Sequence, residues 1–280
     1  MKKVLVTGAG GFVGSRILQQ WSGSYVLCTA PKGFFAAAKK DEVCALVETL
    51  HPDVILHTAA LSDTGFCAQH PEQAYRANVE LPLWLAEAAQ QTGAKLVAFS
   101  SDQVYAGTTL RGPLPETMIL QPSNLYGRYK LEAERRMLEC CPDSVHLRAS
   151  WMYDLPGYGL PIRGNLPLNL LRAALRGETV CFSRNDYRGV TYVRQVVENL
   201  KRVLELPGGV YNFGSGNDAD MVRTVRQFAD AMGISVNVEE ADWSRNLVMD
   251  SKKLECAGVW FDTTRQGILR CLRDYGLLQP

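Results

Sequence analysis

VLVTGAGGFVG, residues 4–14, is the stretch that decides the fold of this chain. An apolar run typical of a buried strand leads into glycines at positions 8, 11 and 14, with Gly10 as an extra one. Gly8 allows a turn with positive φ, Gly11 lets the backbone approach a pyrophosphate, and Gly14 lets a following helix pack closely on the strand. This order of strand, glycine turn and helix start predicts a dinucleotide-binding unit whose helix N-terminus faces the phosphates.

The composition is typical of a globular protein with one large domain or two closely joined ones. Of the 280 residues 46% are hydrophobic, and 30 basic against 29 acidic residues leave a net charge of +1. Because no run of Lys and Arg forms a basic patch, we expect no nucleic-acid partner. Uninterrupted apolar stretches of about 18 residues are absent, so we expect no membrane span. Glycines interrupt the first apolar run, so we also expect no signal peptide.

The cysteines and histidines show no spacing typical of a disulfide framework or a metal site. Eight cysteines occur without a Cys-x-x-Cys pair, and the four histidines are scattered along the chain. Reduced thiols of this kind are typical of a cytoplasmic protein. We therefore expect a cytoplasmic location and no metal.

Alternating strand and helix patterns after the glycine loop predict a doubly wound, parallel α/β sheet. The expected elements are a helix over 12–21, a strand over 25–29, a helix over 41–50, a strand over 54–57, a long helix over 71–91, a strand over 95–101 and a helix from 123–124 onward. Small residues at 58–60 follow one strand and leave room for a ligand. Asn78, inside the long helix, is either a polar surface residue or an amide that tethers neighbouring backbone.

The end of the second strand bears on which dinucleotide is bound. NAD-specific folds place an acidic residue there for the ribose 2′-hydroxyl, whereas residues 29–32 contain no Asp or Glu. Lys32 or Arg16 can instead meet a 2′-phosphate, although each can equally be a solvated surface cation. We expect NADP(H) as the favoured cofactor and NAD(H) as the alternative. The expected cofactor contacts come from Gly8, Gly11, Phe12, Val13, Gly14, Lys32, Ala59 and Ala60, and from the two helical residues Tyr126 and Lys130.

Ser101, Tyr126 and Lys130 are the candidate catalytic residues. Tyr126 and Lys130 are four positions apart on a predicted helix and share one face. A neighbouring ammonium favours the phenolate, so we expect Lys130 to lower the pKa of Tyr126. Ser101, at a strand end, can orient a substrate carbonyl toward Tyr126 as general acid, while NAD(P)H gives the hydride. Tyr129 is a competing phenol, but it shares the lysine's face less well.

These motifs resemble the extended short-chain dehydrogenase/reductase superfamily and, within it, the dTDP-4-dehydrorhamnose reductases. SSDQVYAG at 100–107 is similar to that family's Ser-Thr-Asp-Tyr-Val-Phe-Asp-Gly, and RASWMY at 148–153 to its Arg-Thr-Ser-Trp-x-Tyr. GVTYV at 189–193 and DSKKL at 250–254 resemble two further family segments. The resemblance covers nearly the whole chain. It implies a Rossmann-like fold and NAD(P)H-dependent reduction of a 4-keto-6-deoxy sugar nucleotide.

Departures from the family pattern lie where the substrate would be recognised. Gln103 replaces the family's Tyr, Ala106 its Asp and Val190 its Pro, so the identity of the sugar nucleotide stays open. Gln103 cannot act as the Glu of the related 4,6-dehydratases, because an amide does not exchange a proton at neutral pH. A C4-epimerase that keeps its NAD bound, and a non-catalytic cofactor-binding regulatory subunit, remain alternatives.

We expect residues 1–150, with 186–214 returning to them, to form the dinucleotide-binding domain. Residues 151–185 and 215–280 are expected to form a smaller substrate-binding lobe, and the Pro- and Gly-rich segment 155–167 a loop over the site.

The resemblance implies that the smaller lobe grips the nucleotide sugar, with a homodimer left open as the assembly. Trp151 either stacks on the ligand or belongs to the core. Arg188 and Arg245 are either diphosphate ligands or structural residues. The candidate substrate contacts are Asp102, Gln103, Trp151 and Arg188.

Overall fold

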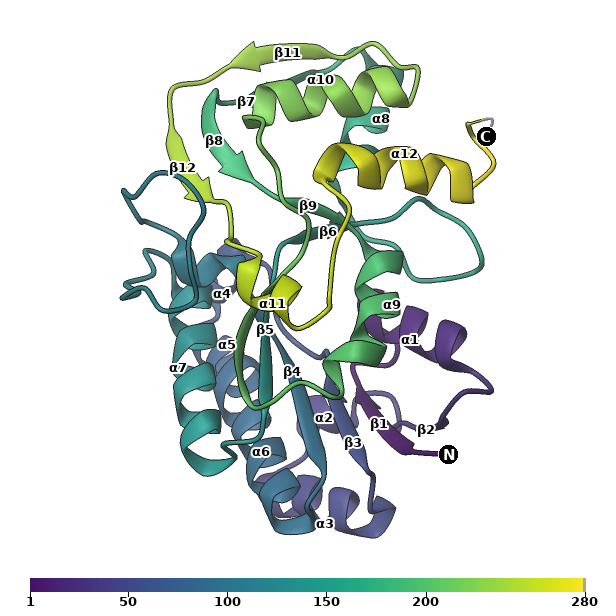
Figure 1. The fold of residues 1–280 in the computed structure, drawn as a ribbon, viewed down its shortest axis with the longest axis vertical. Coiled ribbons are helices and arrows are strands. Elements are labelled where there is room, and N and C mark those ends of the chain that lie inside the picture. The colour runs from purple at the N-terminus through teal and green to yellow at the C-terminus, as the bar shows by residue number, and fades with distance from the viewer. Residues whose placement is uncertain (279–280) are drawn as a thin grey trace.

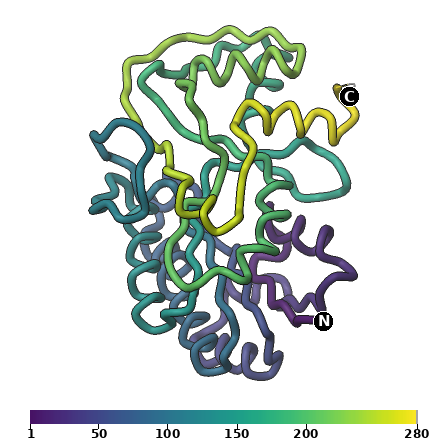
Figure 2. The backbone as a smooth tube through the Cα atoms, viewed as in Figure 1, coloured from purple at the N-terminus to yellow at the C-terminus, as the bar shows by residue number. Residues whose placement is uncertain are grey.

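Six parallel strands form the central sheet of a computed structural model that describes residues 1–278 (Figures 1 and 2). The strands lie in the order β10-β5-β4-β3-β1-β2. Their bounds are β1 Lys3–Thr7, β2 Val26–Cys28, β3 Val54–His57, β4 Lys95–Ser101, β5 Val145–Ala149 and β10 Gly209–Phe213. The chain steps from β1 to β2 on one side and then crosses to β3 on the other, so the order reverses between β1 and β3. Ligands of open parallel sheets bind outside the carboxyl ends of the strands at such a point.

Helices cover both faces of this sheet because its strands are apolar on both sides. Val4 and Val6 of β1 pack with α1 (Phe12–Trp21) and α9 (Val193–Val203). Leu5 points to the opposite face, where the core is shared with three other helices. These are α3 (Lys40–Leu50), α6 (Leu81–Thr92) and α7 (Leu125–Cys140). The expected doubly wound α/β fold is confirmed.

The long helix expected over 71–91 is interrupted. It consists of α5 (Pro71–Tyr75), a π-helical turn (Arg76–Glu80) and α6. Asn78 lies in that turn, fully buried, and its Nδ2 donates a hydrogen bond to the Leu61 carbonyl at 2.9 Å. The tethering interpretation is therefore confirmed. π-Helical turns of this kind are frequent at functional sites.

A smaller unit lies above the carboxyl edge of the sheet (Figure 1). Its strands pair in twos, β6 with β9, β7 with β11 and β8 with β12. The helices α8, α10 and α12 pack together with these strands around Tyr153, Tyr192 and Phe228. The bounds are β6 Trp151–Tyr153, β7 Thr179–Phe182, β8 Asn185–Arg188, β9 Val190–Tyr192, β11 Asn237–Glu240, β12 Ser244–Leu247, α8 Leu166–Arg176, α10 Met221–Ala231 and α12 Thr264–Asp274.

Strand pairing distributes the later chain between the two units. β8 and β9 pair within the smaller unit, while α9 and β10 pack on the large sheet and extend it. The short helix α11 (Lys252–Cys256) also packs on the large unit, through Leu254. The remaining short helices are α2 (Phe34–Ala37), α4 (Thr64–Gln69) and the 3-10 turn η2 (Asp102–Tyr105).

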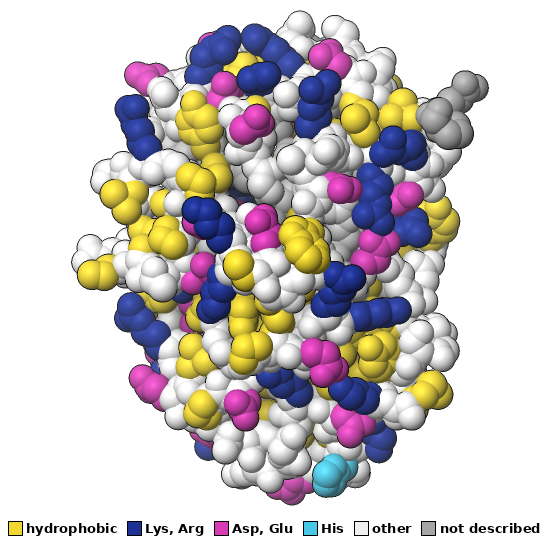
Figure 3. Space-filling view, viewed as in Figure 1, with side chains coloured by type: hydrophobic (Ala, Val, Ile, Leu, Met, Phe, Trp, Pro, Cys, Tyr) yellow, Lys and Arg dark blue, Asp and Glu magenta, His cyan; other side chains and the backbone are white. Residues whose placement is uncertain are grey.

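Within residues 1–278, no helix combines the length and apolar character needed to cross a membrane. The eight cysteines, all in this part of the chain, carry free thiols. On the face shown in Figure 3, Lys and Arg side chains are scattered among acidic and apolar ones.

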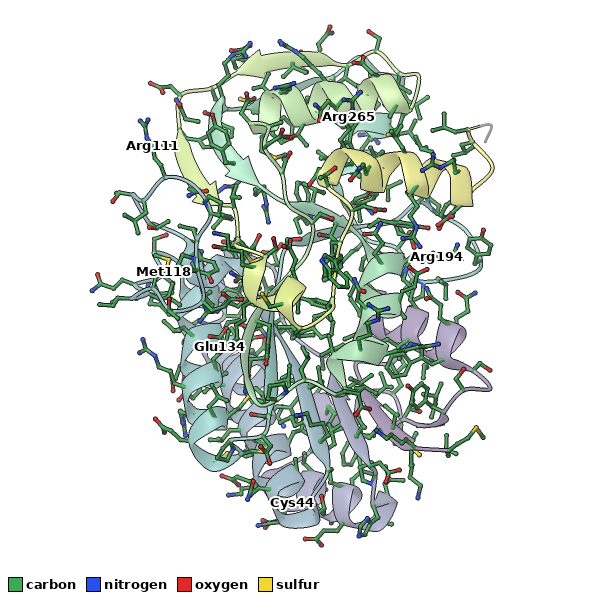
Figure 4. The ribbon with its side chains drawn as sticks, viewed as in Figure 1. Cys44, Arg111, Met118, Glu134, Arg194 and Arg265 are labelled. Atoms are coloured by element: carbon green, nitrogen blue, oxygen red, sulfur yellow. The ribbon has the colours of Figure 1, made fainter. Side chains whose placement is uncertain are left out.

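A buried ion pair ties α7 to the sheet; its acidic partner, Glu134, is labelled in Figure 4. Arg148 of β5 donates two hydrogen bonds from Nε and one from Nη2 to the Glu134 carboxylate, the shortest at 2.7 Å. Its Nη1 donates to the Tyr105 hydroxyl at 2.8 Å. Both charged side chains are at most 4% exposed. Breaking a pair with this burial leaves an uncompensated charge in the interior.

We expect Glu134→Gln to lower the free energy of unfolding by about 3 kcal/mol, because the Arg148 guanidinium then stays buried without a counter-charge. Urea unfolding measures the change. The matched control is Glu205→Gln, which removes a carboxylate from an exposed pair with Lys2 and should cost less than about 1 kcal/mol. Equal midpoints for the two variants would contradict the importance of the buried pair.

Candidate active site

The glycine loop makes two close backbone contacts, one at Gly8 and one at Gly14. Gly8 has φ +70°, and a Cβ there would lie 2.8 Å from the Ala59 nitrogen. A Cβ on Gly14 would lie 2.2 Å from the Gly8 carbonyl oxygen. Only glycine fits at either place. Helix α1 starts directly at the loop, and no side chain caps its first turn. Such a start offers free N–H groups, which suit the diphosphate of a dinucleotide.

The loop after β3 is fixed to the glycine loop by hydroxyl groups. The Thr58 hydroxyl donates to the Thr7 carbonyl at 2.7 Å, and Thr7 Oγ1 lies 2.8 Å from His57 Nδ1. Burial lowers the pKa of His57 to about 3, so the imidazole is neutral. Ala59 thus comes to lie against Gly8, with the exposed Ala60 next to it.

The two cations proposed for a 2′-phosphate differ in their surroundings. Lys32 is exposed in the turn after β2. Arg16 is buried, and its Nε donates to the Asp154 carboxylate at 2.6 Å. Its Nη1 donates to the carbonyls of Phe12 and Pro161. The expectation that Arg16 can meet a 2′-phosphate is wrong, because its guanidinium is committed to a buried ion pair.

Ser101, Tyr126 and Lys130 lie together at the carboxyl edge of the sheet, all three buried. The 3-10 turn η2 carries the chain away immediately after Ser101, and α7 approaches that turn at Gly127, where a Cβ would lie 2.2 Å from the Gln103 carbonyl oxygen. Asn124 begins the helix by accepting a hydrogen bond from the Gly127 N–H at 2.8 Å. Sequence reasoning did not assign Asn124 and Gly127 these roles, although Asn before a helix and Gly one residue after Tyr126 were available signals.

The electrostatics of this group differ from expectation. Burial raises the pKa of Tyr126 well above its ordinary value, against smaller opposing effects of the Ser101 hydroxyl and the Arg163 charge. The expected net lowering of this pKa by Lys130 is wrong, because burial outweighs the effect of the lysine. Its ammonium lies 5.9 Å from the Tyr126 ring centroid and donates to the Phe99 carbonyl at 2.9 Å. Burial also lowers the pKa of Lys130 to about 8.

The residues expected to contact the substrate lie close together beside Ser101. They are Asp102, Gln103, Trp151 and Arg188. Arg188 of β8 donates from Nη2 to Asp102 Oδ2 at 2.8 Å, and its guanidinium lies 5.0 Å from the Trp151 ring centroid. The other carboxylate oxygen of Asp102 accepts from the Ser101 hydroxyl at 3.2 Å and from Gln103 Nε2 at 3.3 Å. This buried ion pair links the large unit to the smaller one beside Ser101.

A cleft of about 1700 Å³ lies between the two units. Gln103 and Asn124 line it from the large unit, and Arg245 and Arg265 from the smaller one. Arg245 is paired with the buried Asp186 at 2.5 Å. Arg265, the second residue of α12, and Arg111, on the loop between η2 and α7, also line this cleft and are labelled in Figure 4. Among residues 1–278, no group of three or more metal-ligating side chains is clustered.

Comparison with known proteins gives curated relatives with more than one name. The dTDP-4-dehydrorhamnose reductase of Aggregatibacter actinomycetemcomitans is 28% identical over 222 residues, which cover 76% of this chain and 73% of that protein. The methionine adenosyltransferase 2 subunit beta of Bos taurus is 35% identical over 164 residues, covering 54% of this chain and 47% of that protein.

Solved structures share the fold over almost the whole chain. A dTDP-4-dehydrorhamnose reductase from Bacillus anthracis, in complex with NADP, superposes with a TM-score of 0.86 at 21% identity, covering 98% of this chain and 99% of that one. A UDP-glucose 4-epimerase from Thermotoga maritima, with UDP-glucose, superposes with a TM-score of 0.80 at 19% identity and the same coverage. The Rossmann-like architecture is thereby confirmed.

The model of the RmlD substrate binding domain family matches residues 1–275, and this chain therefore belongs to that family, as its resemblance to the dTDP-4-dehydrorhamnose reductases indicated.

Proposed function

We propose that this protein is an NAD(P)H-dependent reductase of a 4-keto-6-deoxy sugar nucleotide. The observation that carries the proposal is the meeting of Ser101, Tyr126 and Lys130 at the carboxyl edge of the sheet, the edge on which the glycine loop also lies. A reductase needs a proton donor and a carbonyl-orienting group beside the cofactor. Family membership and the names of the relatives support the same activity.

In this mechanism Tyr126 gives its proton to the C4 oxygen of the sugar while the bound dinucleotide supplies the hydride. A phenol whose pKa is raised by burial stays protonated at neutral pH, as a general acid in reduction must. The Ser101 hydroxyl orients the carbonyl, and the Lys130 ammonium stabilises the negative charge that forms on Tyr126. Lys130 also holds the nicotinamide ribose.

The large unit binds the dinucleotide in this proposal, and the smaller unit binds the sugar nucleotide. Gly8, Gly11 and Gly14 form the diphosphate cradle together with the N–H groups of Phe12 and Val13, and Ala59 and Ala60 form the facing wall. The exposed Lys32 favours NADP(H) over NAD(H) by meeting the 2′-phosphate, since no acidic residue stands at residues 29–32.

On the substrate side, Asp102 and Gln103 contact sugar hydroxyls, and Trp151 offers a flat face to the ligand. Arg188 is already paired with Asp102, so it acts by holding that carboxylate in place as well as by meeting the substrate.

NADPH oxidation with a panel of dTDP-, GDP- and UDP-linked 4-keto-6-deoxy sugars tests the proposal. We expect consumption of NADPH with at least one of them. Conversion of a sugar nucleotide without net cofactor consumption would instead identify an epimerase. Tight NADPH binding with no turnover of any member would favour a cofactor-binding subunit.

We expect Tyr126→Phe to lower kcat by about 100-fold or more, because the proton donor is removed, while NADPH affinity stays within about twofold. The matched control is Tyr129→Phe. Tyr129 lies one turn away and packs its ring against Tyr75, so this variant should keep its kcat. Full turnover by Tyr126→Phe would contradict the assignment of Tyr126 as the acid.

The pH dependence follows from Lys130. Its pKa of about 8 means that it is charged below pH 8 and neutral above it, so kcat should fall as pH rises through that value. Lys130→Met should have a low kcat that no longer decreases as pH rises through 8, since the titrating group is gone. A wild-type kcat that stays constant to pH 10, with the protein folded throughout, would be incompatible with a required charge on Lys130.

A further inference from the structure

The segment joining β6 to α8, residues 154–165, is fastened at both ends. Asp154 is buried and accepts hydrogen bonds from Arg16 at 2.6 Å and from the Tyr275 hydroxyl at 2.9 Å. Asn165 Nδ2 donates to the Asp154 carbonyl at 3.0 Å, so the two ends of the segment hold each other. The two ends of the segment are thus held together, and Asp154 anchors them to Arg16 of α1.

The middle of this segment lies against the start of α1. The Pro161 carbonyl accepts a hydrogen bond from Arg16 Nη1 at 3.0 Å, and Arg16 itself belongs to α1. Arg163 follows two residues later, and its guanidinium lies 5.8 Å from the ring centroid of Phe12, the first residue of α1. Arg163 Nη1 donates to the Ser62 hydroxyl at 2.9 Å.

These contacts place Arg163 between the start of α1 and the loop after β3. Phe12 belongs to the end of the glycine loop, and Ser62 belongs to the loop after β3. In the proposed function the diphosphate of the dinucleotide lies at the start of α1, beside these contacts. The Arg163 charge also has a small lowering effect on the pKa of Tyr126.

The two arginines beside Phe12 differ in how their charge is satisfied. Arg16 forms a buried ion pair with the Asp154 carboxylate. For Arg163, the ion pairs and hydrogen bonds formed among residues 1–278 include a neutral hydroxyl and no carboxylate. An exposed guanidinium near the start of α1 that lacks a carboxylate partner is suited to an incoming anion, because its fork of donors matches phosphate oxygens.

We propose that Arg163 is a cofactor-binding residue that exchanges the Ser62 hydroxyl for an oxygen of the dinucleotide diphosphate. Segment 154–165 then acts as a strap across the bound cofactor, held to the large unit by Arg16. The inference rests on the proposed function for the presence of the dinucleotide, and it assigns one further residue to that site.

Titration calorimetry with three ligands tests the inference: NADPH, ADP-ribose and adenosine 2′-monophosphate. ADP-ribose contains the diphosphate without nicotinamide, and the monophosphate contains neither. We expect Arg163→Ala to lower the affinity for NADPH and for ADP-ribose by about 10- to 100-fold, and the affinity for adenosine 2′-monophosphate by less than about twofold. The affinities of Arg163→Lys for NADPH and ADP-ribose should lie between those of the wild type and of Arg163→Ala, because a point charge replaces a fork of donors.

The control variant is Arg172→Ala, which removes one exposed arginine from α8 and should leave all three affinities unchanged. Arg163 is itself exposed, so its variants should keep the wild-type melting temperature. Unchanged or tighter binding of ADP-ribose by Arg163→Ala would overturn the inference and leave the proposed function standing. Equal weakening of all three ligands would also overturn it. A wild type that binds neither NADPH nor ADP-ribose would overturn both.

Discussion

Close backbone approach at the switch point between β1 and β3 is the constraint on which the rest of the structure depends. Gly8 meets the backbone of Ala59, and Gly14 meets Gly8, at distances that no side chain allows. This packing starts α1 directly at the sheet edge. The parallel pairing of β1, β3 and β4 then puts Ser101 on the same edge as the cradle. The position of the site therefore depends on glycine placement at the loop and on the parallel sheet together.

Two buried ion pairs then join the smaller unit to this edge. Arg16 and Asp154 fix the segment that leads into the smaller unit, and Asp102 and Arg188 link the two units beside Ser101. Buried pairs contribute little net stability compared with apolar packing, but losing one partner is costly. Their place here suggests that they fix the relative position of the units, and with it the geometry of the cleft in which the sugar nucleotide is proposed to bind.

The sequence predicted most of the large unit, because its signals are local. The helices expected over 12–21 and 41–50 are found at Phe12–Trp21 and Lys40–Leu50, where apolar spacing and turn residues place them. Arg16 was misjudged because its partner Asp154 is 138 residues away, and no local pattern reveals that contact. The pKa of Tyr126 was misjudged for a similar reason, since burial by distant segments outweighs a lysine on the same helix. Arg163 lies in a loop without a motif, so only the folded structure brings it to Phe12.

The central claim is hydride transfer to C4 of a sugar nucleotide by this protein. The direct measurement is a single-turnover reaction with NADPH deuterated at C4 of the nicotinamide, run separately with each of the two labelled faces, and NMR of the sugar product. The account predicts deuterium at sugar C4 from one face and none from the other. A product formed without deuterium from either face, or no product with any 4-keto sugar nucleotide, would contradict it.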